Sequence, residues 1–218
     1  MRMGARIGFA LCVLSAASAA AAGTGVPDAQ QWSEIDLSGA TSTHTSLTGL
    51  AQLRLSENLP NPVYTAAGLD FAFQHSEWTI TAGYRHQVTG HQTDDPKVTQ
   101  VGLIAVQYAH RFDRGTLALR SRIENTVHAT ANPWRLRLRA EYRWATPGMG
   151  VLSYLYTNDE VFYQASLSEW YRNRFQAGAA LRLDERTSFL IYYQRQDDRV
   201  NTPGALNVLG IVFKAEPR

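Results

Sequence analysis

Apolar and polar residues alternate with a period of two along most of the chain beyond residue 44. The clearest stretch covers residues 134–144, where apolar side chains occupy the even positions and four arginines and one glutamate occupy the odd positions. Successive side chains of a β-strand point to opposite faces, so this order places all five charges on one face, whereas a helix would scatter them around its axis. The pattern therefore predicts a long amphipathic β-strand.

Ten segments of this kind follow one another, and none of similar length has the pattern of an amphipathic helix. The predicted strands cover about 45–56, 63–75, 77–90, 98–111, 115–128, 133–145, 149–163, 170–183, 187–197 and 205–214. Tight turns at 75–77, 113–115, 146–148 and 184–186 alternate with longer connections near 57–62, 90–97, 129–132, 164–170 and 198–204. This alternation predicts an up-and-down antiparallel meander whose two ends face different environments.

The predicted fold is an all-β, up-and-down antiparallel transmembrane β-barrel of about ten strands. An even number brings both termini of a bacterial outer-membrane barrel to the periplasmic end. Residues 32–38 also alternate and are interpreted as an extra strand, a plug or a periplasmic lead-in; with them the count could become twelve. Strand 149–163 has mixed parity, which indicates a β-bulge.

The N-terminus has the pattern of a cleavable secretory signal. Arg2 and Arg6 precede the apolar segment 7–14, and small residues fill 15–22, so we expect cleavage after Ala20 or Ala22. The predicted organisation is a signal peptide at 1–22, a lead-in at 23–44 that includes the extra strand as an option, a barrel at 45–214 and a tail at 215–218. The expected location is the bacterial outer membrane, reached by export through the periplasm.

Cleavage changes the charge balance and the thiol content. Without Arg2 and Arg6, the 21 basic residues become 19, equal to the 19 acidic residues, and the single cysteine, Cys12, is lost. A mature chain with no net charge gives no reason to expect nucleic acid as a partner. It can form no disulfide, and no cluster has the spacing of a metal site, so neither a metal nor a cofactor is expected.

Alternation alone leaves open whether the apolar face meets lipid or a protein core. The segments are longer than the five or six residues usual for soluble strands, and a membrane crossing takes about 9–11. The polar face is rich in arginine, and Lys97 and Lys214 are the only lysines. Aromatic residues cluster at both strand ends, as in the interfacial girdles of membrane barrels. They are Tyr64, Trp134, Tyr163, Trp170 and Tyr171 on the long-connection side and Phe73, Trp78, Phe112, Tyr142 and Trp144 on the short-turn side. These features favour the membrane barrel over a secreted soluble β-barrel.

Several short motifs together resemble one known family. They are Trp32 with Glu34, AQLRL at 51–55, GLDF at 68–71, TAGYR at 81–85, RLRLRAEYR at 135–143, DEVF at 159–162, NRFQAG at 173–178 and YYQRQ at 192–196. In this order the chain resembles the bacterial outer-membrane barrels grouped as domain of unknown function family 2490. The resemblance implies a β-barrel in the outer membrane, and the family has no assigned activity.

Strand parity predicts which polar residues point into the lumen. They are Arg54, Asp70, Gln74, Arg85, Arg120, Arg122, Glu124, Arg135, Arg137, Arg139, Glu141, Arg143, Glu160, Arg174, Arg182, Gln194 and Gln196. About ten strands enclose little space, so these arginines and acids are expected to pair across the lumen. A structural or interaction barrel with an arginine–carboxylate network is the favoured interpretation. A narrow anion-preferring pore or a barrel that binds a small anionic solute is the alternative, because arginines outnumber acids on this face.

A rim-located outer-membrane hydrolase is a third hypothesis. His91, Asp94, Asp95, His128, Asp197 and Asp198 lie near the ends of the long connections, where a carboxylate pair and a His–Asp pair could activate water. The chain contains neither Gly-x-Ser-x-Gly nor His-Glu-x-x-His, so we assign no catalytic residue and expect no enzyme. The expected partners are outer-membrane lipids and the barrel-assembly machinery.

Overall fold

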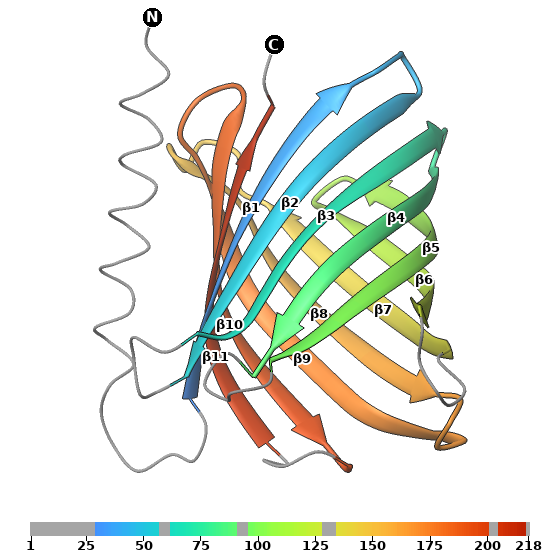
Figure 1. Ribbon diagram of the computed structural model, residues 1–218. Helices are drawn as coiled ribbons and strands as arrows, with labels where there is room; N and C mark the ends of the chain where they lie inside the picture. The colour runs from blue at the N-terminus through green and yellow to red at the C-terminus, as the bar shows by residue number, and fades with distance from the viewer. Residues whose placement is uncertain (1–28, 57–61, 91–95, 128–133, 201–204, 217–218) are drawn as a thin grey trace, which may run out of the picture.

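The computed structural model describes residues 29–56, 62–90, 96–127, 134–200 and 205–216. They form eleven β-strands that close into one barrel (Figure 1). The strands are β1 (Ala29–Ala40), β2 (Thr45–Ser56), β3 (Pro62–His75), β4 (Trp78–Thr89), β5 (Lys97–Phe112), β6 (Gly115–Val127), β7 (Trp134–Ala145), β8 (Leu152–Gln164), β9 (Glu169–Arg182), β10 (Thr187–Asp198) and β11 (Ala205–Ala215). The predicted all-β, up-and-down barrel is confirmed. Among the described residues there is no helix long and apolar enough to cross a membrane.

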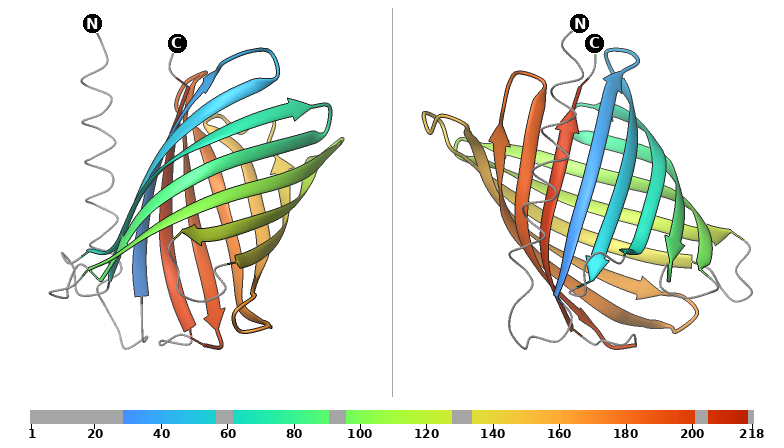
Figure 2. Two further views of the ribbon diagram at one scale, coloured as in Figure 1. Left: turned by 45° about the vertical axis from the view of Figure 1, so that its right-hand side comes forward. Right: turned by 60° about the vertical axis from the view of Figure 1, so that its left-hand side comes forward.

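The eleventh strand comes from the segment whose role the sequence left open. Residues 32–38 lie within β1, which pairs antiparallel with β2 on one side and parallel with β11 on the other. The barrel therefore begins at Ala29, and β1 closes it against the last strand (Figure 2). Every other neighbouring pair is antiparallel and consecutive in the chain.

The described residues form an odd number of strands and not the expected even number, so the first residue of β1 and the last residue of β11 lie at opposite ends of the barrel. Since β1 runs parallel to β11, Ala29 lies at the end of the barrel that carries the long connections, whereas Ala215 lies at the short-turn end. Positive φ angles are rare outside glycine in this barrel. Among the described residues, only Ser76, in the two-residue turn between β3 and β4, and Ser168 have one.

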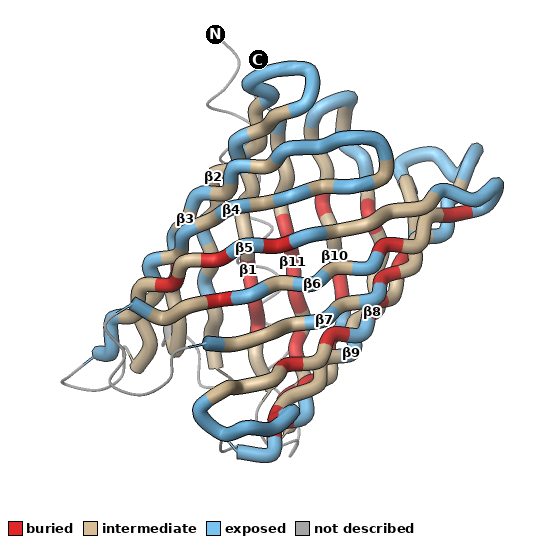
Figure 3. Tube along the Cα trace, turned by 90° about the vertical axis from the view of Figure 1, so that its right-hand side faces the viewer, coloured by how far each residue is buried: buried red, intermediate tan, exposed pale blue. Residues whose placement is uncertain are grey.

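The barrel is apolar outside and polar inside. Large apolar side chains in the middle of the strands face outward, such as Leu69, with 56% of its surface exposed, and Ile104, with 61%. Glu124, Glu141 and Glu160 point inward and are buried. Buried and exposed residues accordingly alternate along β5 and β8, and exposure is continuous around the turns (Figure 3).

The bulge predicted within residues 149–163 corresponds to a register shift between Leu152 and Tyr154, where Ser153 has no partner in the β8–β9 ladder, and a second shift places an extra residue on β9. At the second, Phe162 pairs with Arg172 while Tyr163 pairs with Trp170, so Tyr171 has no partner across the ladder. An extra residue of this kind is a β-bulge, and it turns Tyr171 inward, with 5% of its surface exposed.

Two residues that were predicted to belong to the aromatic girdles point into the barrel instead. Tyr171 is turned inward by the bulge, and Tyr64 lines the lumen. The tryptophans of the predicted girdles do face outward, with 43–53% of their surfaces exposed: Trp78, Trp134, Trp144 and Trp170. Two tyrosines pack edge-on against them, Tyr142 at 4.6 Å from Trp144 and Tyr163 at 5.5 Å from Trp170 between ring centroids.

Candidate functional site in the barrel lumen

All eleven strands contribute side chains to one polar cavity of about 480 Å³ inside the barrel. Twelve of the charged residues predicted for the inner face line it: Arg54, Arg85, Arg120, Arg122, Glu124, Arg135, Arg137, Arg139, Glu141, Arg143, Glu160 and Arg174. Gln194 lines it too, and Gln196 is buried beside it. Asp70 contacts Arg85, whereas Gln74 and Arg182 are exposed near the short-turn end.

Glu124 on β6 is surrounded by arginines from its own strand and from β7. Arg135 donates from Nε to Glu124 Oε2 at 2.7 Å and forms a second contact through Nη2. Arg137 donates from Nη1 to Oε1 at 2.7 Å, and Arg122 lies 3.5 Å from the same oxygen. One buried carboxylate thus compensates several guanidiniums, which is the geometry that stabilises charge in a dry environment.

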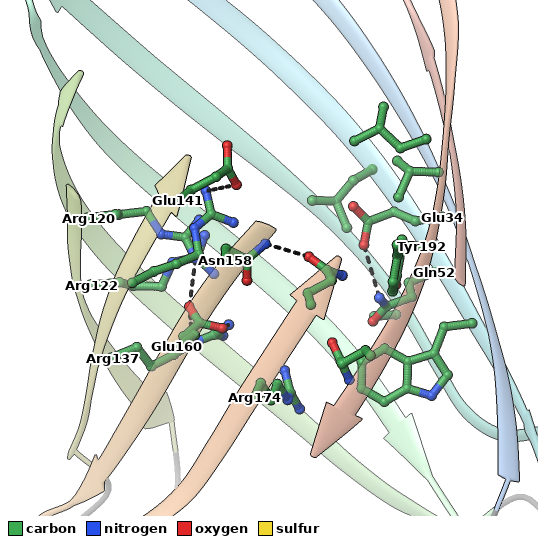
Figure 4. A pocket seen from close by; sticks show the side chains of 18 of the residues that line it. Glu34, Gln52, Arg120, Arg122, Arg137, Glu141, Asn158, Glu160, Arg174 and Tyr192 are labelled. Atoms are coloured by element: carbon green, nitrogen blue, oxygen red, sulfur yellow. Dashed lines mark hydrogen bonds and ion pairs between the residues drawn. The ribbon is translucent and has the colours of Figure 1, made fainter. Parts of the chain in front are cut away.

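Glu160 on β8 likewise accepts hydrogen bonds from two arginines, one on β6 and one on β7. Arg120 donates to Glu160 Oε1 at 2.7 Å, and Arg137 donates to Oε2 at 2.7 Å and to Oε1 at 3.3 Å. Arg137 therefore bridges Glu124 and Glu160 and links β6, β7 and β8. Figure 4 shows Arg120, Arg122 and Arg137 gathered on the same side of the lumen as Glu160. The three strands are held together by charge-assisted bonds in addition to their backbone ladders.

The register explains why these glutamates are needed. Arg120 stands opposite Arg139, and Arg122 stands opposite Arg137, across the β6–β7 pair. Like charges directly opposite one another destabilise a sheet. Glu124 and Glu160 reach into this double row of guanidiniums, and on β7 Glu141 accepts from Arg143 at 2.6 Å and lies 3.5 Å from Arg139.

A separate ion pair lies on β3 and β4. Arg85 donates through both terminal nitrogens to the two oxygens of Asp70, each at 2.6 Å. A Cβ added at Gly83 would collide with Asp70 Oδ1, so the absence of a side chain there gives the carboxylate its place.

A second group of lumen residues surrounds Trp32 on β1, whose ring contacts two arginines. The Arg54 Cζ lies 3.8 Å from the Trp32 ring centroid and 4.0 Å from that of Tyr64. The Arg174 Cζ lies 5.1 Å from the Trp32 ring and 4.7 Å from the Phe162 ring. The two guanidiniums stack on aromatic faces, an arrangement that orients them through cation–π attraction.

Several lumen residues were missed by the sequence analysis: Trp32, Glu34, Gln52, Arg172 and Tyr192. Gln52 shares strand parity with Arg54, and Arg172 shares it with Arg174, so the alternation could have identified both. Glu34 accepts a bond from Gln52 at 3.0 Å, and Arg172 pairs with Asp198 at 2.5 Å. Predicting that Trp32 and Glu34 line the lumen would have required the assignment of residues 32–38 to a strand of the barrel.

The lumen carries an excess of positive charge. Ten arginines and Lys214 line the cavity, against four glutamates. Adding Asp36, Asp70 and Asp198, which pair with Lys214, Arg85 and Arg172, gives eleven basic residues against seven acidic ones. The side chains of the lumen therefore carry a net positive formal charge.

The residues considered for a rim hydrolase do not form a cluster in the described chain. His91, Asp94, Asp95 and His128 lie outside the described residues. Asp198 is held by Arg172 in the lumen, whereas Asp197 pairs with Arg195 at 3.0 Å and is exposed. In the described part of the chain, no group of three or more His, Cys, Asp or Glu side chains could hold a metal ion.

Comparison with known proteins places the chain in a family. No curated protein matches the sequence. The sequence model of one family, described as "Protein of unknown function (DUF2490)", matches residues 29–207. This match begins with the first residue of β1 and ends within β11, so it covers nearly the whole barrel. The chain therefore belongs to the DUF2490 family of proteins of unknown function.

Proposed function

We propose that this protein is an integral β-barrel of the bacterial outer membrane, exported by a cleavable signal peptide, with a structural or interaction role. The observation that carries the proposal is the polarity of the wall: apolar side chains in the middle of the strands face outward and charged ones face inward. In a bilayer the outer band is solvated by lipid chains and the aromatic pairs at the strand ends lie near the two interfaces.

The secreted soluble barrel would require the opposite arrangement. A soluble protein rarely exposes a contiguous apolar surface larger than a few hundred Å². Here Leu69, Ile80 and Ile104, on three consecutive strands, are each at least half exposed. The orientation of these side chains supports lipid as the surrounding medium.

The arginine–carboxylate network supports a structural role for the lumen. Glu124, Glu141 and Glu160 each accept short hydrogen bonds from arginines, which occupy carboxylate oxygens that a general base would need. A carboxylate held in this way makes a poor general base, because the bonded guanidinium stabilises its charged form. The network thus braces three strands, and we propose that the protein is not an enzyme.

Cell fractionation combined with gel mobility tests the location. We expect the protein in the outer-membrane fraction, where the folded barrel resists detergent until boiled and then migrates differently. Recovery from the soluble periplasmic fraction, with no change of mobility on boiling, would reject the proposal.

A lipid-facing substitution sharpens this test. Ile104 lies at the middle of β5, and an arginine near the bilayer midplane costs about 2–4 kcal/mol. Ile104→Arg is expected to reduce the heat-modifiable fraction strongly, and Ile104→Val to leave it unchanged. Equal assembly of both variants would argue against lipid at this surface.

A narrow anion-preferring pore is the second candidate, favoured by the excess of basic residues around the cavity. The purified barrel in a planar bilayer would then conduct anions better than cations. Arg139→Gln, which removes one lining charge, would reduce that preference. A well-inserted barrel that conducts no current would reject the pore and leave the structural role in place.

A further inference from the structure

Two of the lumen arginines differ from the others in what holds them. Arg54 and Arg174 form no ion pair within 4.0 Å with any acid among the described residues. Their side-chain hydrogen-bond partners are neutral amides: Arg54 Nη2 donates to Gln52 Oε1 at 3.0 Å, and Arg174 Nε donates to Gln196 Oε1 at 2.6 Å. Amides orient a guanidinium but do not neutralise it.

Two acids on neighbouring strands are already engaged by other arginines, and a third, Glu34 on β1, accepts a bond from Gln52 and forms no ion pair within the described chain. Glu160, opposite Arg174 in the β8–β9 register, accepts from Arg120 and Arg137, and Asp198 is paired with Arg172. Arg54 and Arg174 therefore have no carboxylate in direct contact, since Glu34 reaches Arg54 only through Gln52, and both guanidiniums contact the ring of buried Trp32. Two guanidiniums on one indole ring repel each other, and an anion bound by both would relieve that repulsion.

Donor groups around this pair also lack partners. Arg54 Nε and Gln194 Nε2 are buried and form no hydrogen bond within the described chain, and both residues line the cavity. Stacking between Trp32 and Tyr64 covers both faces of Arg54, so its remaining N–H groups are directed along the edge of the guanidinium. Edge-on N–H groups are the donors that bind oxyanions.

We propose that Arg54, Arg174 and Gln194, arranged around Trp32, form a binding site for a phosphate group. Two arginines and an amide with unpartnered N–H groups suit an anion with several acceptor oxygens, and a phosphate group offers three of them with about −1.5 to −2 charges at pH 7. A carboxylate offers only two acceptor oxygens. The phosphate is inorganic phosphate or the phosphate of a small soluble monoester, and the site requires the folded barrel but not its location in the outer membrane.

Trp32 provides a local readout of binding. It is 3% exposed and is the only one of the five tryptophans that is buried; the other four face outward. Replacing Trp78, Trp134, Trp144 and Trp170 with phenylalanine leaves Trp32 as the only tryptophan, which can be excited selectively over the tyrosines. In the barrel refolded in detergent, sodium phosphate at constant ionic strength is expected to change the Trp32 fluorescence saturably, and sodium chloride is not. Calorimetric titration of the unsubstituted barrel gives the same constant independently of the tryptophan substitutions.

Substitutions at the site test the assignment. Arg54→Gln and Arg174→Gln are each expected to weaken phosphate binding by about tenfold or more, the usual effect of losing a bond to a charged group. Arg195→Gln is the matched control, because Arg195 lies on β10 between Gln194 and Gln196 but on the outer face, paired with Asp197. Glycerol phosphate competing equally with inorganic phosphate would identify a site that accepts monoesters; failure to compete would restrict it to the free ion.

The folded state of each variant is checked by its heat-modifiable mobility. Where Arg54→Gln fails to fold, Arg54→Lys keeps the charge but loses the planar fork, and it should still bind phosphate more weakly than the unsubstituted protein. The proposal is overturned if the folded, unsubstituted barrel shows no saturable response to phosphate. It is also overturned if Arg195→Gln weakens binding as much as Arg174→Gln, because the attraction would then be non-specific. Neither result depends on the fractionation experiment.

Discussion

Buried arginines are held in two different ways on the two sides of this lumen. On β6–β8 they surround Glu124 and Glu160, and Arg137 connects the two carboxylates. Around Trp32, Arg54 from β2 and Arg174 from β9 stack on the indole and, among the described residues, form hydrogen bonds only to amides. The first arrangement pairs each guanidinium with a carboxylate, whereas the second holds the guanidiniums without a direct carboxylate partner.

This difference indicates which arginines contribute mainly to the stability of the barrel. A neutralised guanidinium cannot be removed without leaving a buried carboxylate underpaired, so its contribution appears in stability. A guanidinium held by rings and amides leaves no directly paired carboxylate behind when it is removed, so we expect its loss to cost less stability and, if the proposed phosphate site is present, to weaken binding. The aromatic side is itself packed by shape: Trp32 lies against Leu206 and Val208, and Tyr192 lies over Gly210.

The largest expected effect is the loss of a glutamate from the charged side. Glu160→Gln removes the carboxylate shared by Arg120 and Arg137 and should lower the free energy of unfolding by about 3–5 kcal/mol, the cost of uncompensated buried charge. Urea unfolding of the refolded barrel measures it. Asp159→Asn is the control, because this neighbouring carboxylate is exposed and accepts a bond from Asn173. If both variants lost the same stability, the network would not be a brace.

A pair of arginine substitutions tests the contrast directly. Arg137→Gln weakens the hold on two glutamates and should cost about 2 kcal/mol of unfolding free energy, less than Glu160→Gln because Arg120 and Arg135 remain. Arg174→Gln loses its stacking but relieves repulsion from Arg54, so the net change should stay within about 1 kcal/mol. The same urea titration, run at low and high salt, compares them. Equal losses would mean that the two sides do not differ.

The residues that make up the charged side could be predicted from the sequence, because the face that each one occupies follows from strand parity. Alternation over 134–144 places four arginines and Glu141 on one face, and the structure has them in the lumen. The ten segments beyond residue 44 all correspond to strands. The pairing of Glu124 with Arg135 and Arg137 could not be read in advance, because it depends on the register of β6 against β7.

The aromatic side could not be predicted for two physical reasons. Trp32 belongs to β1, and its parallel pairing with β11 joins residues from the two ends of the chain, which local alternation does not encode. Tyr171 was assigned to a girdle from its position at a strand end, beside Trp170, and the bulge at this position turns its side chain inward. Tyr64 lies at a strand end, where an aromatic residue suits a girdle or a lumen equally well.

A glycine substitution tests whether the aromatic side depends on shape. A Cβ at Gly210 would collide with the Tyr192 ring, so Gly210→Ala should cost about 1–3 kcal/mol of unfolding free energy, as overpacking usually does. Gly102→Ala is the control, because a Cβ at Gly102 on β5 meets nothing within 4 Å. Thermal unfolding followed by circular dichroism measures both. Comparable stability of the two variants would show that Tyr192 moves freely and does not define this side.

The smallest expected effect lies at the short-turn rim and sets the baseline for an exposed hydrogen-bonded pair. His110 Nδ1 lies 2.6 Å from Glu77 Oε1, and this hydrogen bond lowers the pKa of the Glu77 carboxyl below its ordinary value of 4.5. A lowered pKa in the folded state stabilises the protein above pH 4.5, and the contribution disappears as the pH falls through the folded-state value. Glu77→Gln should therefore lower the thermal midpoint by at most about 2 °C at pH 7, because exposed pairs contribute little. The difference from the unsubstituted barrel should vanish in acid, whereas a difference that grew as the pH fell would contradict the assignment. Because an exposed pair is screened by solvent, its loss should remain well below that of Glu160→Gln at every pH, and that gap measures what burial adds to the charged side of the lumen.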